Sequence, residues 1–148
     1  MLLYIFTGNQ LRQDKMENTP KTMNGLYENL GKLFYAVAIS DGTVHNNEWE
    51  KVKEYVKEDW LYIDDFTDRY GTDAANQIEI VFDVLMESEK DSQECFNEFK
   101  EFYKIHPHAF SDKIKTLTKK TAKAIASSFS GNNKSELILL AKIELLLN

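Results

Sequence analysis

Apolar residues recur every three or four positions along most of this chain, which is the spacing of an α-helix with one buried face. No segment alternates with the period of two that marks a half-buried strand. The only candidate strand, residues 2–7, has no partner, so we expect no sheet. Six segments carry the helical spacing: 26–37, 46–60, 78–85, 95–103, 111–129 and 137–147.

Polar and helix-breaking residues separate these segments. Thr72 or Asp73 can cap the third predicted helix, and Asp91 or Ser92 can cap the fourth. Pro107 cannot continue a helix, so the fourth ends before it. The positions of these capping and helix-breaking residues therefore agree with the helix ends that the apolar spacing predicts.

The last predicted helix is apolar nearly all round. A helix of this kind is either central in a bundle or part of an interface. We expect central packing, with a homodimer interface as the alternative. Lys142 and Glu144 interrupt the apolar segment, and it is shorter than the roughly 20 residues that cross a bilayer, so we expect no membrane span.

Composition favours an all-α fold in one domain. The chain has 148 residues with only 6 Gly and 2 Pro, which leaves few turns for an all-β sandwich. A chain of this length can bury a full core without disulfides. We predict a single-domain bundle of about six to seven helices over residues 22–148. Residues 1–21 are an N-terminal extension, or the true start is Met16 or Met23.

The cellular setting follows from the cysteine count and the first residues. One cysteine, Cys95, excludes an intramolecular disulfide framework and suits a reducing compartment. The apolar first six residues are short and have no basic residue before them, so they make a poor signal peptide. We therefore expect a cytoplasmic protein.

Charge is distributed unevenly along the chain, whose net charge is −6. Residues 41–101 carry a net charge of −12, whereas residues 102–148 carry +5. The acidic middle would repel phosphate backbones, so we expect no nucleic-acid partner. Five lysines between residues 113 and 123 form either the solvated face of a helix or a contact for an acidic partner.

Candidate chemistry lies at the turn between the first two helices. Gly42 supplies the positive φ that ends a helix, and Asp41 and Glu48 flank the turn. The two carboxylates serve either local backbone hydrogen bonding or a hard cation such as calcium or magnesium. Further cation ligands would come from the nearby residues His45, Asp64, Asp65 and Asp68.

This turn, with the sequence AISDGTVHNNE over residues 38–48, resembles the signature of the TerB-like family, which includes tellurite-resistance proteins and a domain of a DnaJ-like co-chaperone. The resemblance implies an all-helical bundle built as two related halves. The corresponding second turn is IASSFSGNNKSE over residues 125–136, where Gly131 and Glu136 match but Ser130 replaces the aspartate. The internal repeat is therefore degenerate.

The resemblance also implies a function. Family members are associated with stress and tellurite resistance, with metal binding at acidic clusters, and with assembly on membrane-protein or chaperone partners. Asp41, Gly42 and Glu48 are the residues carried over by position. We accordingly expect a non-catalytic binding module that acts through a divalent cation or a protein partner, in some settings within a membrane-associated complex.

Three alternatives differ in chemistry. One is an adaptor subunit that self-associates through its C-terminal helix. Another is a hydrolase that uses paired carboxylates or His45, although solvated helix faces explain the many acids with fewer assumptions. The third is a zinc site at His106 and His108, which would need more nitrogen and sulfur ligands than the chain readily offers. Cys95 lies on an apolar helix face and is expected to be a buried thiol rather than a nucleophile.

Overall fold

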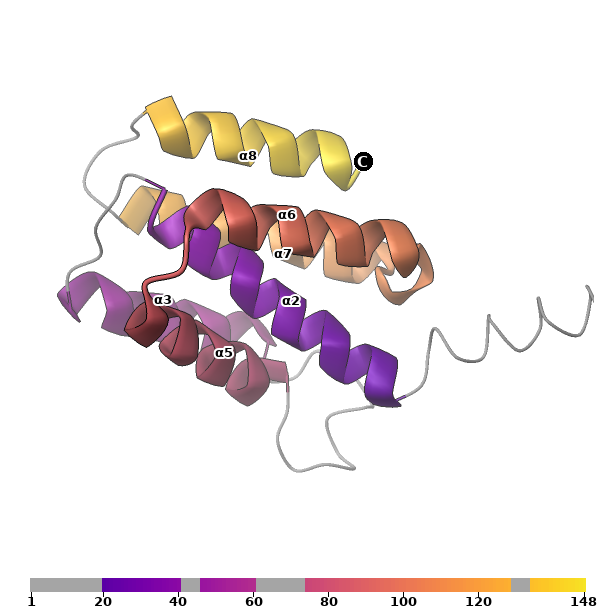
Figure 1. Ribbon diagram of the computed structural model, residues 1–148, viewed down its shortest axis with the longest axis horizontal. Coiled ribbons are helices and arrows are strands. Elements are labelled where there is room, and N and C mark those ends of the chain that lie inside the picture. The colour runs from indigo at the N-terminus through magenta and orange to yellow at the C-terminus, as the bar shows by residue number, and fades with distance from the viewer. Residues whose placement is uncertain (1–19, 41–45, 61–73, 129–133) are drawn as a thin grey trace, which may run out of the picture.

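The structure is a computed structural model that describes residues 20–40, 46–60, 74–128 and 134–148 (Figure 1). These ranges contain helices and no strand, so the all-α prediction is confirmed for them. The candidate strand 2–7 lies outside the described residues. The helices are α2 (Pro20–Ala38), α3 (Asn46–Trp60), α5 (Ala74–Ser88), α6 (Ser92–Ile105), α7 (Asp112–Ser128) and α8 (Lys134–Leu146), with a short 3₁₀-helix, η1 (Pro107–Ala109).

Each of the six predicted helices is present. The bounds of α3 agree with the predicted segment 46–60. Asp91 caps α6, because its side chain accepts a hydrogen bond of 3.1 Å from the backbone N–H of Glu94. Pro107 ends α6 and begins η1, as its missing N–H requires.

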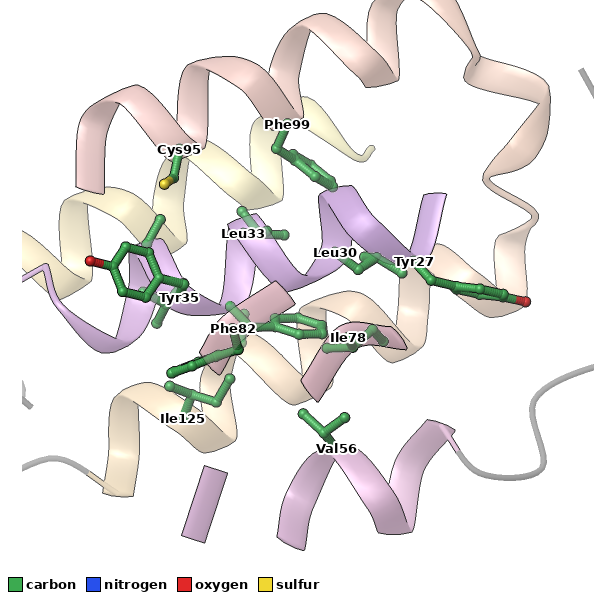
Figure 2. Packing of buried hydrophobic residues seen from close by; sticks show 14 of the residues in the cluster. Tyr27, Leu30, Leu33, Tyr35, Val56, Ile78, Phe82, Cys95, Phe99 and Ile125 are labelled. Atoms are coloured by element: carbon green, nitrogen blue, oxygen red, sulfur yellow. The ribbon is translucent and has the colours of Figure 1, made fainter. Parts of the chain in front are cut away.

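Helix α2 forms the centre of the bundle and contacts α5, α6, α7 and α8. Its residues 33–38 are all apolar, and all six are buried, which is possible only for a helix covered on every side. Figure 2 shows Leu33 of α2 lying between Phe99 of α6 and Phe82 of α5.

Helix α8 lies at one edge of the bundle rather than at its centre (Figure 1). The expectation of central packing is therefore wrong for this helix. Leu139 and Ile143 are buried against the bundle, whereas Leu137, Ile138 and Leu145 are exposed. An all-round apolar pattern shows that a helix can be covered on every side, but it does not show that a partner element is available to cover it.

Two hydrogen bonds fix the end of α2 against the connection between α5 and α6. The hydroxyl of Tyr35 donates to the carbonyl of Lys90 at 2.7 Å, and the hydroxyl of Ser92 donates to the carbonyl of Ala36 at 2.7 Å. The second bond satisfies a carbonyl in the last turn of α2. The end of α2 is therefore held by one backbone carbonyl and one side chain from more than 50 residues away along the chain.

Within the described ranges, no helix has both the length and the apolar character needed to cross a bilayer.

Candidate functional site

The acidic turn lies mostly outside the described residues. Asp41, Gly42 and His45 belong to the gap at 41–45, and the weaker candidates Asp64, Asp65 and Asp68 belong to the gap at 61–73. Glu48 lies in α3, but its side chain is not described. Cation binding by Asp41 and Glu48 therefore stays a prediction.

Glu48 and Glu136 occupy equivalent positions in their helices. Glu48 is the third residue of α3, and Glu136 is the third residue of α8. A glutamate at this position can reach back toward the start of its own helix, as in a capping box. The correspondence is the one drawn from the Gly42 and Gly131 turns. It favours a shared role in beginning a helix.

Glu136 is fully buried, with 0% of the residue exposed to solvent. A charged side chain is rarely buried unless it has partners, and Glu136 has interactions of its own. Sequence reasoning recognised Glu136 as the match to Glu48 but did not predict its burial. The available signal was its place on the same helix face as Leu139 and Ile143.

His106, His108 and Cys95, which lie in the described part of the chain, do not form a metal site there. No three His, Cys, Asp or Glu side chains in the described part of the chain are arranged to hold a metal ion. The ring of His106 instead packs against Phe102, with 4.8 Å between centroids. His108 is exposed in η1.

Cys95 is buried beside Tyr35, as expected for a thiol on an apolar face. Burial raises the pKa of the Cys95 thiol to about 11, because the thiolate would lose its hydration. Burial likewise raises the pKa of Tyr35 to about 12. Neither group is ionised near neutral pH, so neither has the activated form that nucleophilic catalysis needs.

The lysines of α7 are partly engaged by their neighbours. Lys119 lies 3.6 Å from Glu144 of α8, and Lys120 lies 3.4 Å from Asp59 of α3. The ammonium of Lys115 lies 5.9 Å from the ring of Tyr103. This basic run therefore ties α7 to adjacent helices in addition to facing solvent.

An open cleft of about 280 Å³ lies between the end of α2, the start of α6 and α8. Sequence reasoning missed it because three separate segments form it. Ser40, at the end of the segment after α2, and Ser135, in the first turn of α8, both lie in its wall. The other lining residues are Asp91, Ser92, Gln93, Ile138, Leu139 and Lys142.

The outer side of α8 is an exposed apolar surface. Leu137, Ile138 and Leu145 are 52%, 47% and 77% exposed, and Ala141 is exposed between them. Ile138, Ala141 and Leu145 follow one another at three and four residues, so they form a single stripe. We call the residues Leu137, Ile138, Ala141 and Leu145 the α8 face.

The described ranges thus define an all-helical bundle with an exposed apolar face on its last helix. No family model, no curated protein and no solved structure matches the chain.

Proposed function

We propose that this chain is a non-catalytic binding module of the TerB-like kind that acts by holding a protein partner against the α8 face. The observation that carries the proposal is the exposure of Leu137, Ile138 and Leu145 on one helix. The sequence support is the AISDGTVHNNE motif, and the resemblance adds stress response as the process in which a partner would act.

The apolar character of the α8 face favours recognition of another protein. Scattered single apolar side chains are normal on protein surfaces, but a contiguous apolar stripe rimmed by polar residues is typical of interaction sites. The stripe on α8 also has the spacing with which helices are recognised, since anchors separated by three and four residues face one way. A partner would bury these side chains and gain the free energy of removing them from water.

Three groups with displaced pKa values favour binding over catalysis. They are Tyr35, Lys90 and Cys95. The hydrogen bond that the Lys90 ammonium donates to the Glu98 carboxylate, with 2.7 Å between nitrogen and oxygen, raises the pKa of Lys90. All three displacements hold the proton more firmly at neutral pH, whereas a general base or nucleophile needs its proton removed easily.

A site-specific photocrosslinker tests this function. In the full chain, a photoreactive amino acid replaces Leu145 on the α8 face. A matched control chain has the same amino acid in place of Glu101, an exposed residue of α6. We expect a covalent adduct of defined mass from native cells at position 145 but not at position 101. The protein found in this adduct, once purified, should bind the wild-type chain but not the Leu145→Asp variant. Equal background labelling at both positions would overturn the proposal.

A further inference from the structure

Two lysines lie beside the apolar α8 face. Lys134 and Lys142 are exposed on the same side of α8, and neither forms an ion pair with any residue in the ranges described. The acids of this helix are engaged elsewhere: Glu136 is buried, and Glu144 lies 3.6 Å from Lys119. A surface that fits the α8 face must therefore combine apolar side chains with acids.

Helix α5 presents such a surface. Ile80 and Val84 are 58% and 57% exposed, and they lie one helical turn apart. α5 contains Glu79, Asp83 and Glu87 but no lysine or arginine. Asp83 is 3.4 Å from Lys53 of α3, whereas Glu87 is exposed and has no ion pair within the described part of the chain. We call Ile80, Val84, Asp83 and Glu87 the α5 face.

The two faces cannot meet within one molecule. Figure 1 shows α8 along the upper edge of the bundle and α5 along the lower edge, with α2 between them. α2 packs against both helices, which keeps their outer sides apart. A second copy of the chain, in contrast, can bring its α5 face to the α8 face of the first.

We propose that copies of this chain associate head to tail, with the α8 face of one copy packed on the α5 face of the next. This inference rests on the proposed function and names its partner. Lys134 and Lys142 would approach Asp83 and Glu87, while Leu145 and Ile138 would cover Ile80 and Val84. The contact is heterologous, so it generates short chains or a closed ring rather than a simple two-fold dimer.

Charge explains why unlike faces are preferred. Pairing two α8 faces would bring four lysines together, and pairing two α5 faces would bring acids together; like charges across an interface disfavour both. The contact uses one helix from each copy and is therefore small. We expect weak association, with a dissociation constant in the micromolar to millimolar range and a decrease in affinity as salt rises.

Mixing two variants of the purified full chain tests the pairing. Leu145→Asp removes the α8 face, and Ile80→Lys removes the α5 face; both residues are exposed, so circular dichroism should show unchanged helix content. Sedimentation velocity up to about 1 mM, where contacts of millimolar affinity are populated, should show wild-type oligomers. Each variant alone should be monomeric. The mixture should form a one-to-one heterodimer and nothing larger, because one intact α8 face and one intact α5 face remain.

A charge reversal adds a second readout. Lys142→Glu should weaken association about tenfold, and Glu87→Lys in the other copy should restore it. A wild-type chain that stays monomeric overturns the head-to-tail pairing, as does an Ile80→Lys variant that associates like wild type, which would indicate α8 packing on α8. Binding of a monomeric wild type to vesicles with anionic headgroups also overturns it. If any of these results is found, a crosslinked adduct between position 145 and a different protein would still support the proposed function. The absence of any crosslinked adduct at position 145 would reject both the head-to-tail pairing and the proposed function.

Discussion

The indole Nε1 of Trp60 donates a buried hydrogen bond of 3.0 Å to the hydroxyl oxygen of Thr121. That hydroxyl in turn donates to a carboxylate oxygen of Asp59 at 3.1 Å, and the other oxygen of Asp59 lies 3.4 Å from Lys120. The three interactions join the end of α3 to the middle of α7. Trp60 thus fills the core while its only polar atom is satisfied.

Replacing Thr121 should be costly because it leaves two partners unsatisfied. Thr121→Val keeps the size of the side chain but removes the acceptor of Trp60 and the donor to Asp59. We expect a loss of about 1–3 kcal/mol in the free energy of unfolding, measured by urea denaturation. Thr121→Ser, which keeps the hydroxyl, should lose less.

A control substitution lies on the same helix. Thr116→Val, at an exposed position of α7, should change stability by no more than about 0.5 kcal/mol. Equal losses at positions 116 and 121 would contradict this account.

Two glycines of α2 should respond differently to alanine. A methyl group at Gly31 would lie 2.9 Å from the Cβ of Val81 and 3.0 Å from the carbonyl oxygen of Ile78, so the backbones of α2 and α5 would have to separate. We expect Gly31→Ala to cost about 1–3 kcal/mol. At Gly25 the nearest atom is the ring edge of Phe102 at 3.1 Å, and a side chain can shift. Gly25→Ala should be neutral or should stabilise by about 0.5–1 kcal/mol through its helix preference. Thermal unfolding measures the stability of both variants. Equal stabilities for Gly31→Ala and Gly25→Ala would argue against the close approach of α2 and α5 at Gly31.

The thiol of Cys95 should be slow to react and should make stability sensitive to alkali. Burial raises its pKa from 9.0 to about 11, so the folded chain keeps the proton where the unfolded chain releases it. The stability that this shift contributes is complete below pH 9 and is lost as the pH rises from 9 to 11. Urea titrations in this window should show a steep decline for wild type and a shallower one for Cys95→Ala. Tyr35, with its pKa raised from 10.0 to about 12, should extend the decline in both proteins.

Thiol labelling checks the same point independently. In native buffer near pH 8, the folded protein should react with a thiol reagent at least about 100-fold more slowly than the chain in urea, because both thiolate population and access fall. A folded-state rate close to the unfolded one would show that Cys95 is reachable and would remove the basis for the pH prediction.

The sequence predicted the helices well because their determinants are local. The apolar stripe of segment 46–60 and both of its predicted ends agree with α3. Asp91 and Pro107 lie within a few residues of the helix boundaries that they determine. The position of a helix in the bundle is not local. Both helices contain an uninterrupted apolar run, residues 33–38 in α2 and residues 137–141 in α8. All six residues of the α2 run are buried, whereas Leu137 and Ile138 of the α8 run are exposed, beside Lys134 and Lys142.

The candidate site was harder to predict for the same reason. The α8 face exists because no other described helix covers the outer side of α8, and periodicity alone gives no sign of that. The cleft next to Ser40 and the contact between Trp60 and Thr121 also join segments far apart in the chain. The Asp41 turn was found from its motif, and its chemistry must be measured directly.

Divalent-cation binding at that turn can be measured by calorimetric titration of the full chain with calcium, magnesium, manganese and zinc. If Asp41 and Glu48 converge on a cation, calcium or magnesium should give heat in wild type, since carboxylate oxygens prefer hard cations, and two carboxylates should bind only weakly. The double variant Asp41→Asn with Glu48→Gln should lose that heat. Glu50→Gln, an exposed acid on the same helix, should keep it. The absence of heat in wild type, or unchanged heat in the double variant, would reject the cation site.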